Sequence, residues 1–296
     1  TTENARYLPR FQQLCEKYGF KPVWLTNYEM AIDPVYIEFA KDAIARGTAE
    51  IGMHLHAWNS PPTDPLTDDD WRHKPYLIEY SDAAMRAKVD YMTRLLEETF
   101  QTKMVSHRAG RWAFDERYAR LLMEYGYLVD CSVTPRVNWK TAKGAPQGDG
   151  GPEYRHFPQH AYFLDENDIR REGQSSLLEV PMSIQYKHPA WMNSLKQGYD
   201  RLRGKVRSPS VHWLRPMGGN VETMKKVVEQ TLTQGNDYVE YMLHSSEYMP
   251  GGSPTFKNEQ DIERLYADLE SFFSWLAPQV KGMTLAEYYQ QKRTQR

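Results

Sequence analysis

The sequence predicts an α/β fold in which parallel strands are covered by helices. Short apolar runs typical of buried strands alternate with segments of helical spacing along most of the chain. A length of 296 residues suits one large α/β barrel as well as two smaller domains. Because no internal repeat and no convincing linker interrupts the alternation, we expect a single domain that covers residues 1–296.

Helices and strands alternate regularly in the first half of the chain. Tyr7, Leu8, Phe11 and Leu14 recur at helical spacing, and Gly19 is placed to end that helix. Beyond it we expect strands at residues 22–26, 50–56, 103–108 and 127–133, helices at residues 34–46, 81–99 and 115–125, and a polar loop at residues 59–80. This order is typical of consecutive strand–helix units in a parallel sheet.

The alternation is interrupted at residues 134–174, which are rich in glycine, proline and aromatic residues. We expect this loop-rich insertion to cover the mouth of the barrel at the carboxyl ends of the strands. After it we expect strands at residues 177–181, 238–244 and 282–283, a basic helix at residues 194–205, helices at residues 221–234 and 259–276, and a terminal helix.

Composition excludes several classes of protein. A net charge of -2 does not suggest a nucleic-acid binder. Two cysteines, Cys15 and Cys131, cannot form a disulfide framework and have no metal-type spacing. There is no apolar stretch of membrane-spanning length and no secretory signal, so we expect a cytoplasmic protein without a transmembrane segment. The sequence carries no signal that fixes the oligomeric state.

Two histidines, His54 and His56, end the strand expected at residues 50–56. Side chains two residues apart on a strand point to the same face, so both imidazoles should lie on one side. Paired imidazoles where an apolar run breaks into a loop are typical of a transition-metal site. The alternative is that one ring lines the core and the other is solvated, but the pairing favours a metal or catalytic role.

Other polar residues also follow or end expected strands: Arg108, Asp130, Glu179 and His244. In α/β barrels the catalytic residues come from the carboxyl ends of several strands, because the loops there build the site. Each residue also has an ordinary interpretation: Arg108 as a surface ion-pair partner, Asp130 as a turn former and His244 as a helix cap. Their common placement at strand ends favours a shared site.

Several of these segments resemble successive motifs of the polysaccharide deacetylases, the carbohydrate esterases with the nodulation-factor deacetylase homology domain. The similar segments are residues 50–54, 106–110, 127–133, 178–181 and 242–247. They occur in the family's order from about residue 22 to residue 285. The resemblance implies an irregular (β/α) barrel of seven strands. It also implies a divalent metal, held by one aspartate and two histidines, that activates water against an N-acetyl group.

The resemblance assigns roles only where positions match. The first metal-binding histidine of the family falls on His54, and the second falls on Trp58, so His56 is the nearest substitute. Arg108 takes the place of the arginine that orients the catalytic carboxylate, and His244 that of the histidine that protonates the leaving amine. The family's aspartate pair has no counterpart here. We expect it, with the first strand, upstream of Thr1, and Zn²⁺ as the metal.

The predicted function is therefore that of a metal-dependent hydrolase, a polysaccharide deacetylase of bacterial surface-polysaccharide biosynthesis. It would remove N-acetyl groups from an amino sugar or a polysaccharide. Trp58, Trp112 and Glu247 are the expected substrate-binding residues. Aromatic faces stack on sugar rings, although tryptophan is also a common core residue.

Two other functions stay open. A His-x-His at a strand end also occurs in the amidohydrolase superfamily and in related metallophosphatases, but those barrels place it on the first strand and add a late aspartate. The other alternative is a catalytically inactive barrel that binds glycans. The absent aspartates and Trp58 at a ligand position favour that option. Metal content and acetate release would separate these functions.

Overall fold

The computed structural model describes residues 2–189, 192 and 209–296. The basic helix expected at residues 194–205 lies outside the described residues. The α-helices are α1 (Leu8–Lys17), α2 (Tyr28–Ala31), α3 (Pro34–Ala45), α4 (Asp70–His73), α5 (Asp82–Phe100), α6 (Glu116–Glu124), α8 (Val221–Thr233), α9 (Glu259–Leu276) and α10 (Leu285–Thr294). The 3₁₀ helices are η1 (Glu3–Tyr7), η2 (Leu77–Glu79), η3 (Gly110–Trp112) and η4 (Ser245–Tyr248).

The strands form one large sheet and one small sheet. The strands are β1 (Val23–Thr26), β2 (Glu50–Leu55), β3 (Ser106–Ala109), β4 (Val129–Asp130), β5 (Tyr162–Asp165), β6 (Asp168–Glu172), β7 (Leu178–Glu179), β8 (Ile184–Tyr186) and β9 (Val211–Trp213). The large sheet has the order β1-β2-β3-β4-β7-β5-β6, and β8 pairs with β9 in the small one. Strands β1, β2, β3, β4 and β7 are parallel, whereas β5 is antiparallel to both neighbours.

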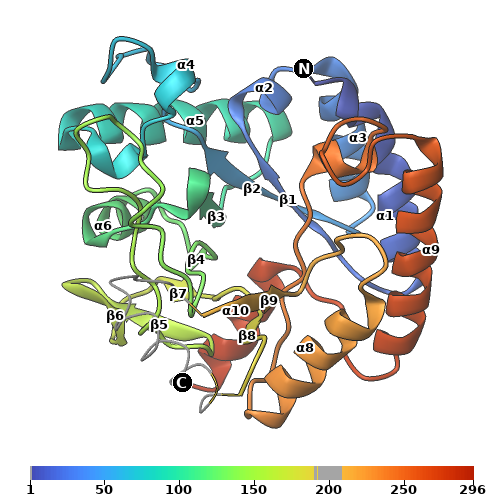
Figure 1. Cartoon of the computed structure of the whole chain (residues 1–296). Helices are drawn as coiled ribbons and strands as arrows, with labels where there is room; N and C mark the ends of the chain where they lie inside the picture. The colour runs from blue at the N-terminus through green and yellow to red at the C-terminus, as the bar shows by residue number, and fades with distance from the viewer. Residues whose placement is uncertain (1, 190–191, 193–208) are drawn as a thin grey trace.

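Helices surround the parallel strands, which run in order through the middle of the molecule (Figure 1). The expected fold class is confirmed: the protein is a mixed α/β fold with a central parallel sheet and covering helices. The barrel is not closed by hydrogen-bonded strands in the described part of the chain, because β1 pairs with β2 alone.

The pattern of β2 explains how the core and the site share one strand. Ile51, Met53 and Leu55 are at most 2% exposed, whereas His54 between them is half-buried. Alternate residues of a strand face opposite sides, so the apolar set faces the covering helices and His54 faces the barrel interior. A glycine is needed at position 52, where a Cβ atom would lie 2.8 Å from the Ser106 carbonyl oxygen of β3.

The strands predicted at residues 238–244 and 282–283 are wrong. Neither segment forms a strand or a helix in the described part of the chain. Residues 238–244 make scattered bonds instead: the Glu240 amide donates to Ser183 Oγ at 2.8 Å, and the Met242 amide to the Leu214 carbonyl at 3.3 Å. A strand needs a neighbouring backbone in register along several residues, which this segment lacks.

The insertion at residues 134–174 has two parts. Its first part is tied to the turn after β3, where Arg111 Nη2 donates to the Lys143 carbonyl at 2.8 Å and Tyr154 Oη to the Trp112 carbonyl at 2.5 Å. This part therefore lies at the carboxyl end of β3, as predicted. The second part forms the β5–β6 hairpin, which the sequence did not predict and which extends the sheet beyond β7.

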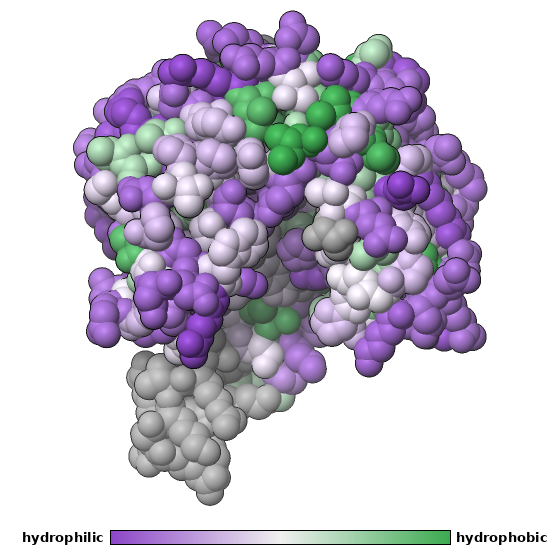
Figure 2. Space-filling view, turned by 90° about the horizontal axis from the view of Figure 1, so that it is seen from above, coloured by the Kyte–Doolittle hydropathy of each residue, from purple (hydrophilic) through white to green (hydrophobic). Residues whose placement is uncertain are grey.

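Polar side chains dominate the surface seen from above, which is hollowed near its centre (Figure 2). No helix among the described residues has both the length and the apolar character needed to cross a membrane.

Candidate active site

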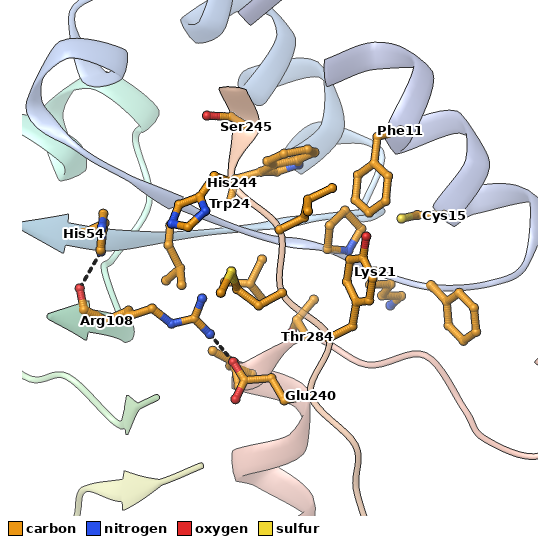
Figure 3. A pocket seen from close by; sticks show the side chains of 18 of the residues that line it. Phe11, Cys15, Lys21, Trp24, His54, Arg108, Glu240, His244, Ser245 and Thr284 are labelled. Atoms are coloured by element: carbon orange, nitrogen blue, oxygen red, sulfur yellow. Dashed lines mark hydrogen bonds and ion pairs between the residues drawn. The ribbon is translucent and has the colours of Figure 1, made fainter. Parts of the chain in front are cut away.

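A cavity of about 890 Å³ lies beside β1, the segment 238–244 and the start of η4. Its wall contains His54, His56, Arg108 and His244 (Figure 3 labels three of them). They come from β2 and the loop after it, from β3 and from the segment before η4, and they are up to 190 positions apart in sequence. A concave site lined by apolar walls and a few convergent polar groups is the usual form of a small-molecule site.

His54 of β2 and His56, just after the strand, lie on the same side, as their spacing predicts. Their ring centroids are 4.5 Å apart, although β2 itself ends at Leu55. His54 Nδ1 lies 2.8 Å from the Arg108 carbonyl oxygen. A carbonyl can only accept, so Nδ1 carries the proton and Nε2 keeps a free lone pair.

Both imidazoles are held neutral at pH 7. Burial lowers the pKa of His54 well below its ordinary value, and the neighbouring His56 lowers it further. Burial also lowers the pKa of His56 to about 4, aided by His244, Lys74 and Arg111. Removing an imidazolium from water penalises its charged form, and adjacent cations add to that penalty. The two histidines therefore present neutral imidazole rings to a ligand in the cavity.

The described residues do not complete a divalent metal site. Neutral imidazoles oriented by a backbone carbonyl are suitable ligands, and His54 has that support. A zinc site in an enzyme, however, uses three protein ligands. No group of three histidine, cysteine, aspartate or glutamate side chains with metal-binding geometry occurs among residues 2–189, 192 and 209–296. The described part of the chain thus offers two candidate donors, His54 and His56, without a third.

Arg108 of β3 reaches across the cavity to a carboxylate. Its Nε donates to the Cys131 carbonyl at 3.2 Å, and its Nη2 pairs with Glu240 Oε1. The guanidinium carbon lies 4.9 Å from the centre of the Trp112 ring. Trp112 has φ of +63°, in the left-handed region that bulky residues rarely adopt. That conformation places the indole against the arginine in the cavity wall.

Glu240 is the site residue that sequence reasoning missed. It lines the cavity, its side chain is 12% exposed, and Arg108 is its ion-pair partner. Burial raises the pKa of Glu240 to about 7, against the opposing effect of Arg108. A sequence signal did exist: Glu240 stands four residues before His244, so the two share a face if the segment is extended.

His244 projects into the cavity from the residue before η4. Its side chain is 61% exposed, and Nδ1 lies 3.1 Å from Glu247 Oε2. Glu247 also accepts from the His244 amide at 3.0 Å and from Arg215 Nη2 at 2.7 Å. Glu247 is buried and is not among the residues that line the cavity. It holds His244 rather than facing the cavity itself.

The two tryptophans expected at the site take different positions. Trp112 forms part of the cavity wall. Trp58 does not: it is stacked on His56, with ring centroids 4.5 Å apart and planes inclined by 12°. Trp58 therefore supports the His56 ring from behind.

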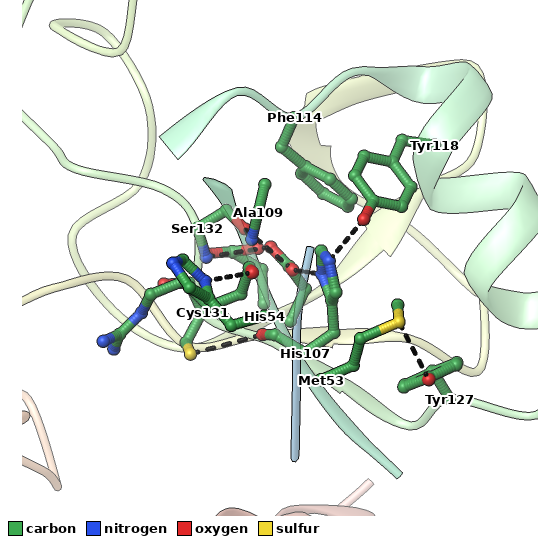
Figure 4. A network of polar contacts seen from close by, with 12 residues as sticks. Met53, His54, His107, Ala109, Phe114, Tyr118, Tyr127, Cys131 and Ser132 are labelled. Carbon is green, nitrogen blue, oxygen red and sulfur yellow. Dashed lines mark hydrogen bonds and ion pairs between the residues drawn. The ribbon is translucent and has the colours of Figure 1, made fainter. Parts of the chain in front are cut away.

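The remaining polar residues at strand ends form a buried network that does not line the cavity (Figure 4). His107 Nδ1 lies 2.5 Å from Asp130 Oδ1, and its Nε2 lies 2.7 Å from Tyr118 Oη. Ser132 Oγ donates to the same Asp130 oxygen, and Glu179 Oε1 accepts from the Val133 amide. Side chains of His107, Asp130 and Glu179 are fully buried and absent from the cavity wall. They belong to the core beneath the site.

Comparisons with known proteins find structural similarity only. No family model matches the chain, and no curated protein sequence matches it. A candidate polysaccharide deacetylase from Mycobacterium smegmatis is similar with a TM-score of 0.57 and 16% identity, over 98% of this chain and 77% of that one. The allantoinase PuuE is similar with a TM-score of 0.54 and 16% identity, over 97% and 72%. A carbohydrate esterase family 4 pseudoenzyme from Bacillus anthracis matches 48% of this chain with a TM-score of 0.34.

At 16% identity, the first two similarities establish the fold and not the reaction. They do confirm the type of architecture expected from the sequence, because both proteins align over nearly the whole of this chain.

Proposed function

We propose that this protein hydrolyses amide bonds and removes N-acetyl groups from an amino sugar or a polysaccharide. The observation that carries the proposal is the convergence of His54, His56, Arg108 and His244 on one cavity. The fold shared with a candidate polysaccharide deacetylase supports the same function.

The exposed histidine supplies the acid that this reaction needs. Amide hydrolysis at neutral pH must protonate a poor amine leaving group, and imidazole is suited to that step. His244 is accessible from the cavity and is oriented through Nδ1 by Glu247, which leaves Nε2 to act on the substrate. Trp112 offers an aromatic face for a sugar ring beside Arg108.

The decisive measurement is acetate release from N-acetylglucosamine oligomers of increasing length. We expect release by the wild-type protein, and its loss by about a hundredfold or more in His244→Ala. His160→Ala is a matched control, because His160 is also exposed and paired with a glutamate, Glu172, but lies outside the cavity. Sugar binding without acetate release would instead identify a glycan-binding protein.

A second candidate is an amide hydrolase that acts on allantoin. The TM-score of 0.54 with PuuE, close to that of the deacetylase, favours including it. Ring opening of allantoin should be assayed beside acetate release with the same variants. Turnover of allantoin without release of acetate from any N-acetylated sugar would replace the first proposal by the second.

A further inference from the structure

We propose that Glu240 is the carboxylate that accepts and holds the proton of the attacking water in this cavity. The inference rests on the proposed amide hydrolysis and names a catalytic residue for it. Glu240 lines the same cavity as His54, His56 and His244, and it reaches that cavity from the segment 238–244 before η4.

The first observation is the hydrogen bonding of the carboxylate. Oε1 pairs with Arg108, whereas Oε2 is buried and accepts no hydrogen bond of ordinary geometry among the described residues. The Cys131 thiol is close enough to lower the pKa of the carboxyl, but it donates to the His107 carbonyl at 3.3 Å. A buried carboxylate oxygen without a donor is costly, so a donor on a ligand or a water molecule would satisfy it. Arg108 fixes the orientation of the carboxylate in advance, because a guanidinium stays charged and holds its partner rigidly.

The second observation is the set of charges around Glu240. The titratable and charged groups that face it are Arg108 from β3, Asp130 from β4, Cys131 after β4, Glu179 from β7 and Tyr238 on its own segment. The set contains one cation, Arg108, and two buried carboxylic acids, Asp130 and Glu179. Burial raises the pKa of Glu240 to about 7, and Asp130 adds to the rise against the opposing effects of Arg108 and the Cys131 thiol. A pKa in that range suits a group that must take up and return a proton near neutrality.

The third observation is the placement of the acid and the base. Figure 3 shows Arg108 extending from β3 to Glu240, with His244 on the other side of the guanidinium in that view. Hydrolysis requires a base on the attacking water and an acid on the departing nitrogen, and separate residues can serve these two positions.

The proton balance of the reaction is complete with these two groups. Water oxygen bonds to the carbonyl carbon, its proton passes to Glu240, and the carbonyl electron pair moves to oxygen. The C–N bond then breaks as protonated His244 gives its proton to nitrogen. The products are acetic acid and the free amine. Acetic acid ionises and returns a proton to His244, and Glu240 returns its proton to the amine.

The test is the pH dependence of acetate release by wild type and Glu240→Gln. Gln keeps the shape of the side chain but cannot accept the proton. We expect kcat to fall by about a hundredfold or more, and the acidic limb of the wild-type profile to disappear. Glu263→Gln is the matched control: Glu263 also pairs with an arginine, Arg10, but on the exposed surface. If kcat of Glu240→Gln stays within about threefold of wild type, the proposal is wrong.

Two further measurements keep the test decisive. If Glu240→Gln does not fold, Glu240→Asp replaces it: a shifted acidic limb supports the proposal, and an unshifted one contradicts it. If wild type releases no acetate, the proposed function fails, and carboxyl carbon NMR then tests Glu240 alone. A resonance absent from Glu240→Gln that titrates near pH 7 supports proton uptake by Glu240; titration at an ordinary glutamate pKa overturns it.

Discussion

At the scale of single residues, the site is built from pairs of residues. One member of each pair faces the cavity, and the other fixes the orientation of its side chain. Glu247 orients His244, Trp58 supports His56, and the Arg108 carbonyl fixes His54. Such supporting contacts fix rotamers and tautomers, which is how a site acquires a single geometry. Substituting a supporting residue should therefore weaken the catalytic contribution of its partner side chain without abolishing that contribution.

Glu247→Gln tests this division of roles. The neutral amide still fills the space but weakens the bond to His244 and the ion pair with Arg215. We expect kcat for acetate release to fall by about tenfold, less than in His244→Ala, while the KM for the sugar stays within about twofold. A large rise in KM with unchanged kcat would show that Glu247 binds the substrate directly.

The histidine pair predicts a loss of stability in acid. An imidazole with a lower pKa in the folded than in the unfolded chain stabilises the fold fully above its ordinary pKa, near 6.5. That stabilisation is lost as the pH falls toward the folded value, which is about 4 for His56. We expect His56 alone to account for about 3 kcal/mol of lost unfolding free energy by pH 4.

Urea unfolding between pH 7.5 and pH 4, in the presence of EDTA, measures this effect. Carboxylates also contribute to acid unfolding, so the informative quantity is the difference between wild type and His56→Gln. The variant should lose less stability across that range. Equal losses would mean that His56 is not held neutral by the fold.

At the scale of elements, Gly110 couples the turn after β3 to the histidine pair. A Cβ atom at Gly110 would lie 2.4 Å from the Leu55 carbonyl oxygen and 2.5 Å from His56 Cδ2. Because moving the Leu55 backbone costs free energy, Gly110→Ala should destabilise the fold by about 1–3 kcal/mol and displace the His56 ring. Imidazole NMR shifts report that displacement.

Gly47→Ala is the control for Gly110→Ala. Gly47 has φ of +68°, and nothing lies within 4 Å of an added Cβ atom. This variant should lose stability through backbone strain alone and leave the His56 resonances unchanged. If both variants leave His56 unchanged, the contact at Gly110 does not set the position of the ring.

The elements also show what the sequence could and could not predict. Local spacing predicted β2 and the shared face of His54 and His56, because side-chain alternation depends on the strand alone. The segment 238–244 has the same apolar character, yet it forms no strand, because pairing depends on a neighbour that no local pattern specifies. Glu240 was overlooked for the same reason: only the fold reveals that Arg108 is its partner.

At the scale of the whole molecule, the cavity lies where the barrel is left open. Strand β1 pairs with β2 on one edge, and its other edge faces the cavity, which the segment 238–244 also lines. The site therefore occupies one end of a long opening that continues to Lys21 and Gln279.

The open edge of β1 makes a prediction for amide hydrogen exchange. The Glu50 amide donates to the Pro22 carbonyl at 3.0 Å, so alternation along a parallel ladder directs the amides of Trp24 and Thr26 toward β2. The amides of Val23 and Leu25 then point to the cavity, where the described residues offer them no backbone partner.

Trp24 and Thr26 should therefore exchange slowly, and Val23 and Leu25 much faster, although all four residues lie in one strand. Residue-resolved exchange by NMR measures this contrast directly. The amides of β2 are an internal reference, because that strand has neighbours on both edges. Equal protection of Val23 and Trp24 would mean that another segment pairs with β1 in solution and closes the barrel. Ligand binding along the same edge should raise the protection of Val23 and Leu25 first, because their amides are the donors that the cavity exposes.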